Sequence, residues 1–355
     1  MRAQRLSKMI ACDHDPYAQA PRFQAFLEEV QPDIEMRLFL QRWFGLSMSA
    51  EPVQALAFFY GMGANGKSVL IDVIAGLLAD YAATVRIESL TGTNRRGGGD
   101  ATPDLIPLIG ARFARTSEPD QGTRLQEGLI KELTGGEPIL VRALHSDFIE
   151  IKPRFKLTMS GNHKPEIRGT DDGIWRRLML VNWPVQIPAD RRNPRLAAEL
   201  AQEGPGILNW MIEGLLSVLE NGLAPPAAVR AATEEYRRES DPVGEFLMAC
   251  CVISGDSADV ISAADLVHAF TLHLIERGET PWKNRTVSLA LADKAARWRH
   301  PETGRSFLKT KASISQYAGL RFTDAFKRRF EAAPKDQSGR PLAAGRAFPD
   351  PDHGL

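Results

Sequence analysis

Residues 58–68 read FFYGMGANGKS, and residues 61–68 fit the phosphate-binding pattern G-x-x-x-x-G-K-[ST]. An apolar run at residues 56–60 precedes the glycines, and apolar residues at helical spacing follow them. The stretch therefore predicts a buried strand, a glycine-rich loop and the start of a helix. Glycines let the N–H groups of such a loop turn toward phosphate oxygens, and the helix N-terminus adds its positive dipole end. We predict that Lys67 reaches the β- and γ-phosphates of ATP, that Ser68 holds Mg²⁺, and that the nucleotide is bound by Gly61, Met62, Gly63, Ala64, Asn65, Gly66, Lys67 and Ser68.

The composition is that of an ordinary globular protein. The chain has 355 residues, 43% of them apolar and 25% charged, which predicts two or three domains with substantial cores. Lys and Arg together number 44, as do Asp and Glu, so any nucleic-acid binding depends on local patches. The three cysteines show no metal-ligand spacing, and no apolar run suits a signal peptide or a membrane span. We therefore expect a cytoplasmic protein without a membrane partner.

Changes of pattern along the chain predict an α/β protein in four parts. Asp241 and Pro242 mark the start of the third part, as N-cap and first helical residue of a new helix. Three helical patterns and a strand-like run at residues 306–309 then favour a winged-helix-like domain. The parts are a helical N-terminal region (1–48), a nucleotide-binding domain (49–238), the winged-helix-like domain (239–332) and a disordered tail (333–355).

Two further strand-like runs end in polar residues that suit a phosphate site. A P-loop ATPase needs a second strand ending in acids, which place Mg²⁺ and polarise the attacking water. The run at residues 111–118 ends in Glu118, which is the candidate acid, with Asp120 in reserve. The run at residues 155–160 ends close to Asn162. Open α/β sheets bind ligands at the carboxyl ends of their strands, so we predict that Asn162 lies at the site.

Candidate nucleic-acid contacts occur in two places. Two β-like runs between residues 139 and 151 predict a hairpin with Arg142 and His145 near its tip. The second place is the stretch 294–340, which has twelve Lys or Arg against four Asp or Glu. Its charge fits a solvated face equally well as a set of phosphate contacts made by Lys294, Arg297 and Arg299.

The sequence as a whole resembles the helicase portion of phage and plasmid primase–helicases, which are superfamily 3 helicases. The matching segments are GANGKS (63–68), SEPDQGTRLQEGLIKELTGGEPI (117–139), KPRFKLTMSGNHKPEIRGTDDGIWRRL (152–178), PGILNWMIEGL (205–215) and ATEEYRRESDPVGEFL (232–247). The resemblance implies an AAA+-like ATPase that forms a hexameric ring on single-stranded DNA. It also implies movement from 3′ to 5′, with ATP hydrolysis at the subunit interfaces.

The resemblance further implies roles for individual residues. Lys67 and Ser68 match the Walker A pair. Ser117 and Glu118 match the Walker B end, where related helicases carry two acids; because Ser117 replaces the first, Mg²⁺ is expected to rest mainly on Ser68. Asn162 matches the sensor asparagine. The remaining matches are Arg177 as the arginine finger with Arg176 as its alternative, Lys131 as a second trans-acting cation, and the turn from Arg142 to Ser146 as the pore hairpin that grips DNA.

Two other functions share part of this pattern. An initiator or loader that is switched by ATP without unwinding DNA would share every motif. A P-loop kinase would share the phosphate loop, but not Asn162 with Arg177 or the basic C-terminal part.

One departure from the family concerns the N-terminus. Family members usually carry a primase domain there, and only about fifty residues precede the ATPase here. We therefore expect either a helicase-only protein or a fragment beginning at Met1, with a primase or polymerase supplied separately. The expected setting is a replication fork in a bacterial host that carries the phage or plasmid.

Overall fold

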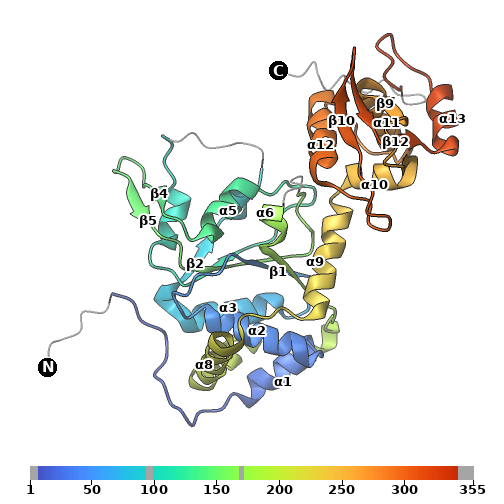
Figure 1. Ribbon diagram of the computed structural model, residues 1–355. Helices are drawn as coiled ribbons and strands as arrows, with labels where there is room; N and C mark the ends of the chain where they lie inside the picture. Colours follow the sequence, from blue (N-terminus) through green and yellow to red (C-terminus); the bar gives the residue numbers. More distant parts are fainter. Residues whose placement is uncertain (1–6, 93–98, 168–171, 343–355) are drawn as a thin grey trace. The chain divides into compact units, whose positions relative to one another are not determined.

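A computed structural model gives the structure of residues 7–92, 99–167 and 172–342. The chain divides into two compact units, Met1–Arg237 and Arg238–Leu355 (Figure 1). Each unit has hydrophobic cores of its own and is described separately below.

A five-stranded sheet in the order β2-β3-β6-β1-β7 forms the centre of the first unit. Its strands are β1 (Leu56–Tyr60), β2 (Ala82–Val85), β3 (Phe113–Thr116), β6 (Lys156–Gly161) and β7 (Leu178–Asn182). All neighbours are parallel, and Leu56 aligns with Leu157 on one side and Leu178 on the other. Parallel sheets are covered on both faces, which explains why these strands are apolar runs rather than alternating ones. The predicted α/β class is confirmed in this respect.

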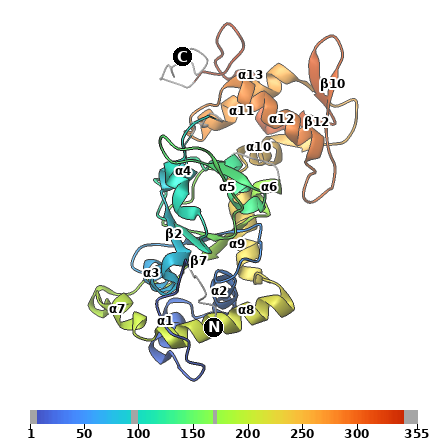
Figure 2. The ribbon, with the colours of Figure 1, turned by 90° about the vertical axis from the view of Figure 1, so that its left-hand side faces the viewer.

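Helices cover both faces of the sheet (Figures 1 and 2). One face carries α1 (Pro21–Val30), α2 (Ile34–Leu46), α3 (Lys67–Leu78) and α8 (Gly204–Asn221). The other face carries α4 (Ile87–Leu90), α5 (Glu127–Gly135) and α6 (Asp172–Trp175). Phe58 and Phe59 are adjacent in β1 but belong to opposite cores, because successive side chains of a strand alternate between faces. The first helices therefore share a core with the sheet.

Two glycines bring α2 and α8 into close contact, and Figure 2 shows the two helices side by side. A side-chain carbon at Gly214 would lie 2.0 Å from the carbonyl oxygen of Gln41. One at Gly45 would lie 2.3 Å from the backbone nitrogen of Leu215. Only glycine permits this approach of two helix backbones.

Smaller elements complete the first unit. Strands β4 and β5 pair antiparallel, which confirms the predicted hairpin. The remaining elements are three short 3-10 turns (Ala79–Tyr81, Pro103–Leu108 and Ala189–Arg191), β4 (Ile139–Val141), β5 (Ile149–Ile151), α7 (Leu196–Ala201) and α9 (Ala227–Glu239).

The second unit combines four helices with short antiparallel strands. The helices are α10 (Pro242–Cys250), α11 (Ala263–Glu276), α12 (Asn284–Arg297) and α13 (Asp324–Ala332). The strands are β8 (Cys251–Ile253), β9 (Val260–Ser262), β10 (Leu308–Lys311), β11 (Ser315–Ala318) and β12 (Leu320–Phe322), in sheets β10-β11-β9 and β12-β8. Asp241 caps α10, as its sequence predicts, by accepting a hydrogen bond from Gly244 N at 2.9 Å.

Part of the predicted tail (343–355) lies outside the described residues, as do residues 93–98 and 168–171. Within the described ranges, no helix has the length and apolar character needed to cross a membrane.

Candidate active site

The glycine-rich loop joins β1 to α3, and two of its glycines lie where a side chain would collide. Gly66 has a φ angle of +83°, and a side-chain carbon there would lie 2.7 Å from Cγ1 of Val30. At Gly61 such a carbon would lie 2.4 Å from the carbonyl oxygen of Trp183. Ala64 also has a positive φ, of 60°. The loop is therefore held in a tight turn against α1 and the segment after β7.

Lys67 is the first residue of α3, and its ammonium group is directed into the loop. Nζ donates hydrogen bonds to the carbonyl oxygen of Gly61 at 2.6 Å, to Asn65 Oδ1 at 3.1 Å and to Asn162 Oδ1 at 3.2 Å. The residue is only 5% exposed. This burial lowers the pKa of Lys67, while the negative charge of Glu118 acts in the opposite direction. A lysine held in this way presents its charge where a phosphate group would approach the loop.

Asn162 links Lys67 to Glu118. Its backbone N–H donates to Glu118 Oε1 at 2.6 Å, and its Nδ2 donates to Glu118 Oε2 at 3.1 Å. The three residues follow three different strands, β1, β3 and β6, which are neighbours in the sheet. Carboxyl ends of parallel strands share one edge of a sheet, so residues distant in sequence meet there. The structure thus brings together Lys67, Glu118 and Asn162, all of which were predicted as site residues.

The same edge fits a nucleoside triphosphate with Mg²⁺. A side-chain carbon at Gly63 would meet no atom within 4 Å, so the loop leaves open space beside the N-terminus of α3. Ser68 and Glu118 are both exposed there, as is the reserve acid Asp120. No group of three His, Cys, Asp or Glu side chains within the described ranges could hold a metal alone. Mg²⁺ characteristically binds one or two carboxylates together with substrate phosphates and water, and this donor set suits that pattern.

A segment that no sequence motif marks also borders the loop. Directly after β7, Trp183 N donates to the carbonyl oxygen of Tyr60 at 2.7 Å, and Ile187 N donates to that of Ala64 at 2.8 Å. These are backbone contacts, so residue types carry no signal for them. They exist because β7 lies beside β1 in the sheet.

Arg177 lies at the opposite edge of the sheet from Lys67. Its carbonyl oxygen accepts a hydrogen bond from Leu56 N, at the start of β1, at 2.7 Å. From Leu56 to Gly61 the strand covers about 16 Å, at roughly 3.3 Å per residue. Arg177 is 6% exposed, and its Nη1 donates to the carbonyl oxygen of Gly173 at 2.5 Å.

Arg177 and Lys131 line one cavity of about 880 Å³. Its other walls include Gln126 and the apolar residues Leu105, Leu129, Leu140 and Phe148. Arg176, the alternative finger, is exposed and donates from Nη2 to Gln54 Oε1 at 3.4 Å. The three cations predicted to act in trans are therefore found away from the glycine-rich loop.

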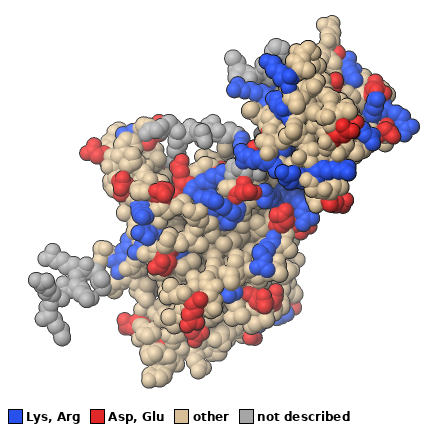
Figure 3. Space-filling view, in the orientation of Figure 1, with Lys and Arg blue, Asp and Glu red and all other residues tan. Residues whose placement is uncertain are grey.

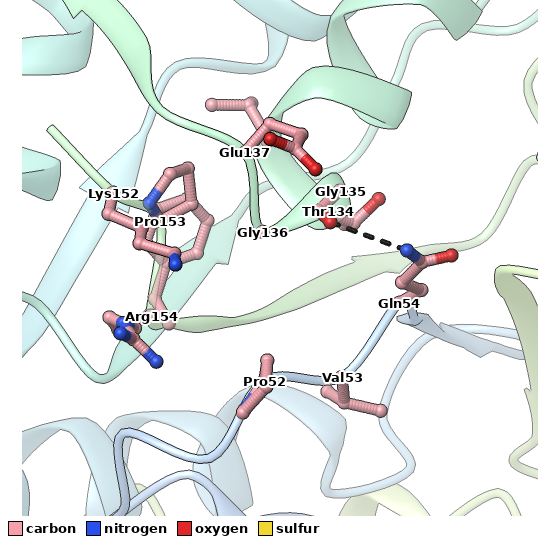
Figure 4. Close-up of a pocket in the computed structure, with 12 residues that line it drawn as sticks. Pro52, Val53, Gln54, Thr134, Gly135, Gly136, Glu137, Lys152, Pro153 and Arg154 are labelled. Atoms are coloured by element: carbon pink, nitrogen blue, oxygen red, sulfur yellow. Dashed lines mark hydrogen bonds between the residues drawn. The ribbon is translucent and has the colours of Figure 1, made fainter.

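A smaller pocket of about 340 Å³ lies at the same end of the sheet as Arg176 and Arg177 (Figure 4). Gln54 forms one wall, and its Nε2 donates to the carbonyl oxygen of Gly135 at 3.3 Å. Lys152 and Arg154 lie across from it in the close-up. Gln54 therefore contacts both the end of α5 and Arg176, and connects the two cavities.

The hairpin places its two predicted DNA contacts differently. Arg142 N donates to Thr102 Oγ1 at 3.0 Å, and the guanidinium group lies 4.7 Å from the centroid of the Phe148 ring. Nη2 of Arg142 also donates to the carbonyl oxygen of Gly99. Arg142 is thus anchored where the loop between β4 and β5 begins, whereas His145 is exposed within that loop with a φ angle of +59°.

The basic residues of the second unit also separate into two kinds. Figure 3 shows Lys and Arg side chains on the visible face of this unit, interspersed with acidic ones. Arg297 and Arg299 are exposed. Lys294, contrary to the expectation of a surface contact, has a side chain only 7% exposed and forms an ion pair with Asp241. Its charge is engaged inside the unit because α12 packs against the start of α10.

The fold and the site first define a class: an α/β protein whose parallel sheet carries Lys67, Glu118 and Asn162 at one edge. Comparisons with known proteins narrow this class. Residues 59–177 match a family model described as a family of unknown function (DUF5906). The chain is 28% identical over 259 residues to the "Putative helicase" of Acanthamoeba polyphaga mimivirus, which covers 68% of this chain and 27% of that protein.

Two further viral proteins give the same picture. A "Putative helicase" of Frog virus 3 is 28% identical over 250 residues, covering 63% of this chain and 25% of that protein. A "Putative primase" of African swine fever virus is 22% identical over 264 residues, covering 69% and 27%. These relatives confirm the resemblance to primase–helicases that the motifs indicate. The chain spans about a quarter of the length of each.

A solved structure shares the fold. The apo structure of the NrS-1 C-terminal region superimposes with a TM-score of 0.52 at 10% identity, over 88% of this chain and 78% of that one.

Proposed function

We propose that this chain is the motor portion of an ATP-dependent DNA replication helicase of superfamily 3. The observation that carries the proposal is the hydrogen-bonded network of Lys67, Asn162 and Glu118 at the carboxyl edge of the sheet. Phosphoryl transfer depends on positioning and on charge neutralisation more than on covalent chemistry. We assign neutralisation of the γ-phosphate to Lys67 and orientation of the attacking water to Glu118. Asn162 would hold the side chains of Lys67 and Glu118 in position.

The cofactor assignment follows from the same edge. The loop from Gly61 to Ser68 would hold the phosphates of ATP through backbone N–H groups and the N-terminus of α3. Ser68 and Glu118 would hold Mg²⁺ together with those phosphates. When bound, the ion supplies charge neutralisation at the transferred group.

Assembly as an AAA+-like hexameric ring is supported by the separation of Arg177 from Lys67. Arg177 and Lys131 line a cavity at the far edge of the sheet, and Arg176 is exposed close by. A head-to-tail contact repeated around a ring would bring this edge of one subunit to the glycine-rich loop of the next. Hydrolysis would then depend on assembly, since each site would need cations from two chains.

The DNA contacts are assigned to exposed groups. His145 at the hairpin turn would contact single-stranded DNA in the pore as the ring moves from 3′ to 5′. In the second unit, which we compare to a winged helix, Arg297 and Arg299 would contact the phosphate backbone of fork DNA. A primase or polymerase would act as a separate partner or in a part of the protein beyond this chain.

Strand displacement by the purified protein tests the proposal. Wild-type protein is expected to hydrolyse ATP faster with single-stranded DNA and to displace a strand from a fork with a 3′ tail. Lys67→Ala serves as the control and should lose both activities. Lys67-dependent hydrolysis without displacement would favour an ATP-switched initiator or loader. Absence of Lys67-dependent hydrolysis would overturn the proposal.

A further inference from the structure

Helix α9 holds the turn from which the two finger candidates emerge. Arg237 Nη2 pairs with Asp172 Oδ1 at 2.5 Å, and the ring of Tyr236 meets that of Trp175 edge-on at a centroid distance of 5.4 Å. Asp172 and Trp175 are the first and last residues of α6. Arg176 N donates back to the carbonyl oxygen of Asp172 at 3.0 Å, so the arginines follow this turn directly.

Tyr236 also contacts the loop that follows Asn162. Its hydroxyl group donates to the carbonyl oxygen of Pro165. Lys164 Nζ lies 5.2 Å from the centroid of the Tyr236 ring and 5.1 Å from that of Tyr60, the last residue of β1. Tyr236 is 3% exposed, so its ring is enclosed by these groups. One side chain of α9 thus contacts both the arginine-bearing turn and the loop beside the phosphate site.

Thr233, one turn earlier, fixes α9 against β7, the outer strand of the sheet. Its Oγ1 accepts a hydrogen bond from Leu180 N in β7 at 2.9 Å and donates to the carbonyl oxygen of Val229 at 2.8 Å. β7 is the last strand on this side of the sheet. The side chain therefore accepts the hydrogen bond of an N–H group on the outer side of β7, and it sets the position of the helix along that strand.

We propose that Tyr236 and Arg237 are positioning residues of the ATP site. Tyr236 and Arg237 connect two parts of one subunit. One is the turn that carries Arg176 and Arg177, which would act in the neighbouring subunit. The other is the loop after Asn162, which would act in the same subunit. The inference rests on the proposed function and deepens it. It names the residues that hold the Arg177 end of the sheet in a fixed position relative to the Lys67 end. The boundary between the two units, at Arg237 and Arg238, falls within this same helix.

The two residues offer changes that leave the fold in place. The side chains of Arg237 and Asp172 are 38% and 81% exposed, and exposed ion pairs contribute little to stability. Tyr236→Phe removes the hydroxyl donor and keeps the ring. Arg238 is exposed on the same helix, so Arg238→Ala is a matched control.

The test compares steady-state hydrolysis by Arg237→Ala, Arg237→Lys, Tyr236→Phe and Arg238→Ala in the full chain with single-stranded DNA. Small displacements of catalytic groups are costly, so we expect kcat to fall about tenfold in Arg237→Ala and Tyr236→Phe. Affinity for a fluorescent, non-hydrolysable ATP analogue should stay at the wild-type value in both variants. The melting temperature should stay unchanged in Arg237→Ala and fall slightly in Tyr236→Phe, which removes the buried hydrogen bond to Pro165. Arg237→Lys should recover part of the lost kcat. The double variant Asp172→Arg with Arg237→Asp, which swaps the two charges, should have a higher kcat than Asp172→Arg or Arg237→Asp alone.

The outcomes separate the inference from the function on which it rests. Wild-type protein without Lys67-dependent hydrolysis would overturn both. Wild-type hydrolysis with Arg237→Ala and Tyr236→Phe indistinguishable from Arg238→Ala would overturn the inference alone. A loss of nucleotide affinity equal to the loss of kcat would also overturn it, because it would indicate general damage to the fold.

Discussion

Arg177 and Lys67 lie at opposite ends of β1. The carbonyl oxygen of Arg177 accepts a hydrogen bond from Leu56 N, where the strand begins, and Lys67 Nζ donates to the carbonyl oxygen of Gly61, just after it ends. About 16 Å of strand separates these attachment points, at roughly 3.3 Å per residue. That distance exceeds the reach of one arginine side chain, so a site that contains both groups needs two copies of the chain.

Mixing two inactive variants tests this shared site. Arg177→Ala and Lys67→Ala should each be inactive alone, because every interface lacks one half of the site. Mixed rings should regain hydrolysis wherever an intact Lys67 meets an intact Arg177. Since arginine fingers contribute about three to five orders of magnitude in rate, even sparse rescue is measurable.

Arg176→Ala provides the comparison, because this arginine is exposed while Arg177 is buried. Rescue in mixtures with Arg176→Ala but not with Arg177→Ala would assign the finger to Arg176. If light scattering shows that mixed rings form and ATP hydrolysis is not rescued at any mixing ratio, the shared-site proposal is contradicted.

Glu118→Gln should bind ATP and hydrolyse it at least about a hundredfold more slowly, because the amide cannot orient water as a carboxylate does. The bonds from Asn162 hold the Glu118 carboxylate in place, whereas Asp120 lies two residues further along an exposed segment. Steady-state hydrolysis and nucleotide binding measured on both Glu118→Gln and Asp120→Asn check the assignment. Near-normal turnover in Glu118→Gln would transfer the role to Asp120.

Arg297→Ala combined with Arg299→Ala should weaken binding to fork DNA and flatten its salt dependence. Each lost phosphate contact lowers the slope of log K against log salt by roughly one, so the double variant should lose about two. Fluorescence anisotropy at several salt concentrations measures this. Arg285→Ala, an exposed arginine on α12, is the control. An unchanged slope would leave these arginines as solvated surface charge.

Lys294→Ala should lower the stability of the protein rather than its binding to DNA, because the ammonium group of Lys294 is paired with Asp241 inside the second unit. Removing one partner of a buried pair costs about 3–5 kcal/mol, and we expect a loss toward the lower end because the Asp241 side chain is 24% exposed. Urea unfolding should show the loss, and the salt slope of DNA binding should not change. A variant with wild-type stability and a reduced slope would instead return Lys294 to the set of DNA-binding residues.

Lys156 gives a pH-dependent stability. It is fully buried, its Nζ donates to the carbonyl oxygens of Ser49 at 2.7 Å and Arg154 at 3.2 Å, and burial lowers its pKa to about 7. In the unfolded chain the pKa returns to about 10.4. Between these values the unfolded state binds more protons, so the free energy of unfolding rises with pH by up to about 1.4 kcal/mol per unit.

Lys156→Met should remove this slope. Urea unfolding at pH 6.5, 7.5 and 8.5 should show the variant gaining on wild type as the pH falls, because only the wild-type protein then has to bury a charged ammonium group. Parallel pH profiles for the two proteins would contradict the assignment.

The sequence by itself determined the local features. The strand, loop and helix around Lys67 are contiguous, so apolar periodicity and glycine preferences are sufficient to predict them. The cap at Asp241 and the hairpin near Arg142 are equally local. Glu118 and Asn162 could be predicted as candidates because each follows a strand, and ligands bind where parallel strands end.

Only the tertiary structure decided which of these residues meet. The order β3-β6-β1 brings Glu118 and Asn162 to Lys67, and the parallel pairing of β7 with β1 sends Arg177 to the far edge. Burial of Lys294 and the anchoring of Arg142 depend on partners distant in sequence, as do the contacts of Tyr236 with two other segments. A local pattern specifies the conformation of its own backbone, whereas burial and ion pairing are set by whichever segments pack against it.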